Sequence, residues 1–204
     1  MRNTNPTLNR RIIVALAIST AVPTLAGEAD KPLTTVEQID IERYMGSWYE
    51  IARYPNFFQR GIVAVKVSYR LKDDGNIVVR NTGRRGTLDG KLTKREALAW
   101  IPDEEMNARW YVRFIWPLRA DYWIIDLAKD YRYAVVGQPS RDNLWVISRT
   151  PTMTDEDYRV ICKNLRQQGY DPDKLKKTLQ PPSRTVSESD GAQEKNASSD
   201  GDKD

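Results

Sequence analysis

The side chains that most often carry out acid–base and nucleophilic catalysis are scarce in this sequence. It contains no histidine and a single cysteine, Cys162. The lack of histidine excludes Ser-His and Cys-His nucleophilic systems, and also histidine-ligated haem or zinc. No glycine-rich phosphate loop and no Cys-x-x-Cys pair occurs. We therefore expect no catalytic residue, no metal and no cofactor, and a binding function is favoured.

Glu50 is the one acidic residue that the strand pattern places among inward-facing side chains. A carboxylate kept away from water has a raised pKa and could act as a general base on a bound lipid. Pairing of Glu50 with Arg149 or with a tyrosine is the simpler interpretation, and we favour it. An enzyme that acts on a lipid stays the alternative to a binding protein.

Eight segments of alternating apolar and polar residues follow one another along the middle of the chain. Such alternation is typical of strands with one buried face. Short connections, such as the turn at Asp74-Gly75, predict antiparallel pairing of consecutive strands. The expected fold is all-β: an eight-stranded antiparallel up-and-down β-barrel, wide enough for one small ligand. The predicted strands are residues 44–54, 62–71, 77–81, 92–101, 108–115, 122–127, 133–137 and 143–149.

One α-helix is predicted after the last strand. Thr154 and Asp157 form a capping box at its start, and Gly169 is placed to end it. The helix should pack against the outside of the barrel through one apolar face, with the cysteine as an inert buried thiol. The apolar face consists of Tyr158, Ile161, Cys162 and Leu165.

The two ends of the chain differ in composition from its middle. Three arginines precede the apolar residues 12–21, and Thr24-Leu25-Ala26 follows them. This order predicts a secretory signal peptide, residues 1–26. Residues 183–204 are rich in serine and charged residues and predict a disordered polar tail. The barrel domain then spans residues 30–182.

Export decides the expected location of the protein. One cysteine cannot form an internal disulfide, so the fold must depend on its apolar core. Residues 20–30 contain no cysteine to which a lipid anchor could be attached. We expect a periplasmic protein, in peripheral contact with the outer membrane at most.

Three motifs of this chain resemble those of the lipocalin family, in the same order. Gly46 and Trp48 form a Gly-x-Trp motif, Asp130-Tyr131 is similar to the second motif with Lys129 in place of its threonine, and Arg149 lies in the third. The resemblance covers roughly residues 40–180 and is strongest to bacterial lipocalins and apolipoprotein D. It implies a carrier of hydrophobic small molecules, such as fatty acids or lysophospholipids, in the bacterial cell envelope.

The motif residues should close one end of the barrel. In a meander of eight strands, the first strand starts where the eighth ends, so Trp48 and Arg149 become neighbours. A guanidinium can stack on the indole there. We expect both residues, together with Gly46, Asp130 and Tyr131, to be structural and not to contact the ligand.

Alternation assigns the residues that face the ligand cavity. If Trp48 points inward, every second residue of its strand does so too, and Arg53 points outward. In the fourth strand, Leu98 and Trp100 compete with the alanines for the inside. The alternative is a small barrel that these side chains fill completely. The predicted cavity residues are Ala52, Tyr54, Val67, Tyr69, Ile77, Val79, Ala97, Ala99, Trp110, Val112, Phe114, Tyr122, Ile124, Val135 and Trp145.

Loops that follow odd-numbered strands meet at the other end of the barrel, and they are rich in arginine and aromatic residues. This end is the predicted open mouth, where arginine would hold an anionic head group. It could also touch an anionic membrane surface. Scattered, solvated arginines are the alternative. The mouth residues are Phe57, Phe58, Arg60, Arg84, Arg85, Trp116, Arg119 and Arg141.

The net charge of +4 would also permit a nucleic-acid partner. The excess is modest and export argues against it, so we expect a lipid ligand and no nucleic acid. A basic module that binds membranes without carrying lipid is a further alternative. The sequence fits a monomer and a homodimer equally well.

Overall fold

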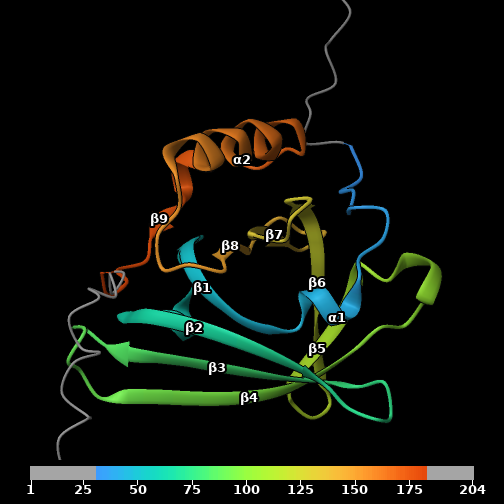
Figure 1. Ribbon diagram of the computed structural model, residues 1–204, viewed down its shortest axis with the longest axis horizontal. Helices are drawn as coiled ribbons and strands as arrows, with labels where there is room; N and C mark the ends of the chain where they lie inside the picture. The colour runs from blue at the N-terminus through green and yellow to red at the C-terminus, as the bar shows by residue number, and fades with distance from the viewer. Residues whose placement is uncertain (1–30, 183–204) are drawn as a thin grey trace, which may run out of the picture.

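Eight antiparallel strands close into a barrel, which confirms the predicted fold (Figure 1). Each strand pairs with its neighbours along the chain, and β1 closes the barrel by pairing with both β2 and β8. The computed structural model describes residues 31–182, so the predicted signal peptide and polar tail lie outside the described residues. The strands are β1 (Gly46–Arg53), β2 (Ile62–Leu71), β3 (Ile77–Arg85), β4 (Leu92–Trp100), β5 (Arg109–Ile115), β6 (Leu118–Leu127), β7 (Tyr133–Gly137) and β8 (Leu144–Ser148).

Some strand boundaries differ from the prediction. β3 runs to Arg85 rather than ending at residue 81, and β6 begins at Leu118 rather than at residue 122. Neither extension buries a large apolar side chain, so apolar alternation carries no signal there. β1 starts at Gly46 because the helical turn α1 (Ile41–Tyr44) precedes it.

A short C-terminal strand, β9 (Lys176–Lys177), was not predicted. β1 pairs with β2 only over residues 46–49, and β9 pairs with the following part of β1. Beyond β9, the amide of Ala64 in β2 donates to the carbonyl of Leu179 over 2.7 Å. The C-terminal segment therefore fills the gap where β1 and β2 separate. The remaining elements are the short 3-10 helices η2 (Phe57–Gln59), η3 (Glu104–Met106) and η4 (Pro172–Lys174).

The predicted helix is present as α2 (Asp155–Gln167), which lies over β1, β7 and β8 on the outside of the barrel (Figure 1). Thr154 caps it, since the Oγ1 atom accepts from the amide of Asp157 over 3.1 Å. Ile161 and Leu165 are buried against the barrel. Cys162 is only partly buried, because it lies at the edge of the apolar face, and this burial raises the pKa of its thiol.

Trp48 and Arg149 close one end of the barrel, as the sequence predicts. The guanidinium carbon of Arg149 lies 3.7 Å from the centroid of the Trp48 ring. The same guanidinium donates hydrogen bonds to backbone carbonyls of residues 43–47. Gly46 has a φ of +89°, and a Cβ atom there would lie 3.5 Å from Nη1 of Arg149. A side chain would fit beside the guanidinium at this distance, so the motif glycine is required for its left-handed backbone conformation.

The second motif lies beside the Trp48–Arg149 pair, in the loop between β6 and β7. The hydroxyl of Tyr131 accepts from the amide of Asp40 over 2.7 Å, which holds the N-terminal segment against the closed end. Asp130 forms an ion pair with Arg132, and that guanidinium also binds Asp157 at the start of α2. The motif therefore joins the closed end to the helix.

Aromatic side chains form the floor of the barrel at the closed end. The hydroxyl of Tyr122 lies 2.8 Å from that of Tyr44 and 2.6 Å from that of Tyr69. Trp110 stacks on Tyr122 with a centroid separation of 5.2 Å. Burial raises the pKa of all three tyrosines, so they stay protonated in the folded protein.

Replacement of Arg149 at the closed end should destabilise the protein. Arg149→Ala removes the contact with Trp48 and leaves three backbone carbonyls, two of them partly buried, without their side-chain donor, so we expect a loss of about 3 kcal/mol in the free energy of unfolding. Chemical denaturation measures this loss. Arg113→Ala is the matched control, because its guanidinium lies over Trp100, 5.6 Å from the ring centroid, where the side chains are partly exposed. Equal losses in both variants would contradict the structural role.

The tyrosine floor should make the protein sensitive to alkali. The folded state raises the pKa of Tyr44, Tyr69 and Tyr122 above the ordinary value of 10.0. Their stabilisation is therefore complete below pH 10 and is lost as the pH rises toward the raised values. Phenolate absorbance should show these tyrosines ionising only together with unfolding. Tyr122→Phe should remove part of this delayed absorbance, whereas titration of all tyrosines before unfolding would refute the assignment.

Candidate functional site

The wall of the barrel interior is apolar. Most of the predicted cavity residues belong to one cluster of buried side chains inside the barrel, which we call the interior cluster. In β4, Ala97 and Ala99 point inward, whereas Trp100 contacts Tyr111 on the outer face. The inner wall is thus set by small and branched side chains above an aromatic floor. The predicted residues in or against this cluster are Val67, Tyr69, Ile77, Val79, Ala97, Ala99, Trp110, Val112, Tyr122, Ile124 and Trp145.

Ala52 and Tyr54 do not face the barrel interior, contrary to the prediction. The pairing of β1 with β8 shifts register between Glu50 and Ala52, which reverses the alternation in the rest of the strand. Ala52 and Tyr54 therefore pack in the second core, between the barrel and α2. The hydroxyl of Tyr54 donates to the carbonyl of Asp171 over 2.8 Å and so anchors the chain that follows the helix.

Two further cavity assignments were wrong. Val135 also lies in the core beneath α2, whereas its neighbours Ala134 and Val136 belong to the interior cluster. Every residue of β7 is buried because the helix covers its outer face, so hydrophobicity could not distinguish the two faces. Phe114 is 51% exposed at the mouth, where β5 and β6 shift register between Val112 and Ile115.

Glu50 is buried and paired, but with neither Arg149 nor a tyrosine. Its carboxylate forms an ion pair with Arg53, which the reversed alternation turns inward rather than toward solvent. Oε2 of Glu50 accepts from the side chain of Gln59 over 2.9 Å, and Oε1 accepts from the hydroxyl of Thr178. The carboxylate is thus engaged from several sides, which leaves it poorly placed to take a proton from a ligand.

This buried network joins the mouth loop to the C-terminal segment. The guanidinium of Arg53 donates to the carbonyl of Gln59 over 2.9 Å and to the hydroxyl of Thr178 over 3.1 Å. The indole of Trp145 donates to Oε1 of Gln59 over 2.9 Å. Gln59 and Thr178 were not predicted, since both lie outside the predicted strands and no motif marks them.

The open end of the barrel exposes large apolar side chains. Phe57 is 85% exposed and Trp116 is 77% exposed. Such a concentration at one end is unusual for a surface that only faces water. The mouth rim, as we call it, consists of Phe57, Phe58, Phe114, Ile115, Trp116 and Leu118.

The predicted mouth arginines do not form one site. Arg141 donates to the carbonyls of Gln168 and Lys31, so it fastens the end of α2 and the N-terminal segment instead of facing a ligand. Arg119 lies over the outer ring of Tyr111, with its guanidinium carbon 4.0 Å from the centroid. These two side chains make contacts outside the barrel that loop position alone could not predict.

The other predicted arginines, Arg60, Arg84 and Arg85, lie at the open end. Arg84 donates to the carbonyl of Gly90 over 3.0 Å and thereby closes the loop between β3 and β4. Arg60 and Arg85 are exposed. A hollow of about 340 Å³ lies beside η2, and its size falls within the usual range for a small-molecule site. It is lined by Arg53, Pro55, Asn56, Phe57, Arg60, Gly61 and Lys176.

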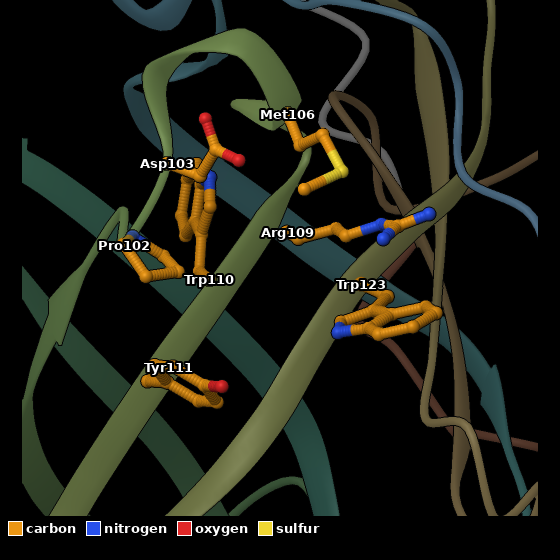
Figure 2. Close-up of a pocket in the computed structure, with 7 residues that line it drawn as sticks. All are labelled: Pro102, Asp103, Met106, Arg109, Trp110, Tyr111 and Trp123. Carbon is orange, nitrogen blue, oxygen red and sulfur yellow. The ribbon is translucent and has the colours of Figure 1, made fainter.

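A second hollow lies below η3, at the opposite end of the molecule. Its volume of about 150 Å³ is below the usual size of a small-molecule site. Figure 2 shows Arg109 beside Trp123, and the guanidinium carbon lies 4.5 Å from the ring centroid. We assign no ligand to it. The remaining lining residues are Pro102, Asp103, Met106, Trp110 and Tyr111.

Two features are absent from residues 31–182. Within this range no cluster of three or more histidine, cysteine or acidic side chains is arranged to hold a metal ion. No helix in the same range is long and apolar enough to cross a membrane. The described residues thus form a barrel with an apolar interior, an aromatic floor, a buried Glu50–Arg53 ion pair on one wall and exposed apolar side chains at the open end.

Known proteins are similar to this chain in sequence and in fold. Residues 39–180 match the family model described as a lipocalin-like domain. Temperature-induced lipocalin-1 of Arabidopsis thaliana is 38% identical over 172 residues, covering 80% of this chain and 90% of that protein. Outer membrane lipoprotein Blc of Escherichia coli K12 is 37% identical over 149 residues, covering 73% and 84%. Apolipoprotein D of Bos taurus is 30% identical over 148 residues, covering 68% and 76%.

The solved structure of insecticyanin from the tobacco hornworm, Manduca sexta, superposes with a TM-score of 0.58 at 18% identity, covering 73% of this chain and 85% of that one. This likeness supports the fold. The family match covers the barrel, the Trp48–Arg149 pair and α2 together. The chain therefore belongs to the lipocalin family.

Proposed function

We propose that this lipocalin binds and carries fatty acids or lysophospholipids, with the acyl chain inside the barrel and the anionic head group at the mouth. The observation that carries the proposal is the contrast between the two ends. One end is sealed by Trp48 and Arg149, while the other exposes aromatic and basic side chains around an apolar interior.

The energetics of an acyl chain fit such a site. A saturated chain of about 14 carbons gains about 10 kcal/mol on burial, at ~0.8 kcal/mol per methylene. The loss of ligand freedom offsets part of this gain. The remainder corresponds to micromolar or tighter binding without any covalent chemistry.

The cell envelope is the proposed place of action. Relatives named outer membrane lipoprotein Blc are 35% and 37% identical to this chain. Together with the signal-like N-terminal sequence, this favours an exported protein that transports or stores lipid. A catalytic role has less support, because the buried carboxylate of Glu50 is engaged with Arg53, Gln59 and Thr178.

Filling the interior should weaken lipid binding. Ala97 lies in the interior cluster and Leu98 on the outer face of the same strand, so Ala97→Phe should weaken binding of tetradecanoate at least tenfold while Leu98→Phe leaves it unchanged. Isothermal titration calorimetry measures both affinities. Circular dichroism and thermal unfolding check that both variants are folded. Normal binding by a folded Ala97→Phe protein would place the ligand outside the barrel.

We further propose that the mouth rim docks on an anionic bilayer, where the protein takes up or releases lipid. Exposed Phe57, Phe58 and Trp116 would enter the interfacial region of the bilayer. Arg60 and Lys176 line the same hollow as Phe57 and complement the negative surface potential. This combination of apolar and basic groups favours an anionic membrane over a neutral one.

Removal of the rim aromatics should weaken membrane contact and spare the fold. Phe57→Ser combined with Trp116→Ser should reduce co-sedimentation with phosphatidylglycerol vesicles several-fold. Val160→Ser is the matched control, because Val160 is an exposed apolar residue on α2, away from the mouth. High salt should weaken wild-type binding. Membrane binding that survives the double substitution would exclude the rim as the docking surface.

A further inference from the structure

Arg95 is the one charged residue on the inner face of β2–β4 among the paired residues 65–69, 77–83 and 93–99. Arg95 pairs directly with Asn81, one step toward the mouth from the pair formed by Ala97 and Val79. The register between β3 and β4 is unbroken, so all four residues face the same side. Ala97 and Val79 belong to the interior cluster. Arg95 is therefore directed to the barrel interior, just above its apolar wall.

The guanidinium of Arg95 has no partner within the part of the chain that the structure describes. Its side chain is exposed there and takes part in no hydrogen bond, ion pair or ring contact among residues 31–182. The amide of Asn81, directly across the ladder, also lacks a hydrogen-bond partner among the same residues. Residues opposite each other in antiparallel strands hold their Cβ atoms about 5 Å apart, so both groups can reach one ligand.

Charges on the outer face of the same strands behave differently. Arg80 and Glu96 form an ion pair across the ladder with 2.6 Å between the charged atoms. No acidic side chain occurs on the inner face among the paired residues 65–69, 77–83 and 93–99. An inward arginine with no counter-charge stays hydrated at the open mouth and offers a strong donor to an anion that enters.

We propose that Arg95, assisted by Asn81, binds the carboxylate or phosphate of an anionic amphiphile inside the mouth. This inference rests on the proposed lipid-binding function and deepens it by naming the group that selects the ligand. The planar guanidinium donates two parallel hydrogen bonds to such a group, while the amide of Asn81 donates a third. The acyl chain would then continue past Ala97 and Val79 toward the aromatic floor.

The test compares ligands that share a chain and differ in the head group. The probes are tetradecanoate, tetradecyl phosphate and uncharged 1-tetradecanol, with affinities measured by quenching of tryptophan fluorescence. The wild-type protein should prefer the anionic probes about tenfold over the alcohol. Arg95→Gln should remove this preference and leave alcohol binding unchanged. Lys94→Gln is the matched control, since Lys94 pairs with Thr82 and lies on the outer face of the same strand.

Each outcome separates the inference from the function on which it rests. A preference that disappears in Arg95→Gln and persists in Lys94→Gln supports the inference, and the anionic probe that loses more affinity identifies the head group. A preference that persists in Arg95→Gln, or disappears equally in Lys94→Gln, overturns the inference while lipid binding stands. If the wild-type protein binds none of the three probes, the proposed function itself is wrong. Asn81→Leu should reduce the preference by a smaller factor, which checks the assisting role.

Discussion

The change of register in β1 after Glu50 is the constraint on which the arrangement of the mouth depends. It turns Arg53 into the barrel, beside the carboxylate of Glu50, and it turns Tyr54 outward beneath α2. A strand without this shift would direct the guanidinium to solvent and leave a buried carboxylate unpaired, which is strongly destabilising. Because the two residues are joined to Gln59 and Thr178, one local irregularity positions the mouth loop and the C-terminal segment together.

A buried ion pair is stable only when its remaining hydrogen-bonding groups are satisfied. Here the partners come from segments that regular pairing would not bring together: Gln59 from η2 and Thr178 from the chain after β9. The C-terminal segment also replaces β2 as the partner of β1 in the mouth half of the barrel. The barrel can therefore widen at its open end without leaving the edges of β1 and β2 unpaired.

Apolar alternation predicted correctly which side chains point inward wherever the ladder is regular. β2–β4 are solvated on their outer face, so charged residues mark that face and the inward positions of Val79, Ala97 and Ala99 follow from period two. Alternation failed at Ala52 because nothing in the residues around Ile51 marks a bulge, and at Val135 because α2 buries both faces of β7. Arginine roles were the least predictable, since Arg141 lies in a mouth loop by sequence yet binds backbone at the end of α2.

The closed end of the barrel contributes to the stability of the fold, whereas the open end contributes to the choice of ligand. Trp48, Arg149 and the tyrosine floor satisfy one another through stacking and hydrogen bonds, so the closed end has little capacity left for a ligand. Affinity must then come from the apolar wall, which any acyl chain would contact in a similar way. Selectivity requires a polar group whose bonding capacity the fold leaves unused. Glu50 and Arg53 are engaged with each other, Gln59 and Thr178, whereas Arg95 faces the interior without a partner among the described residues, so head groups can be distinguished at Arg95.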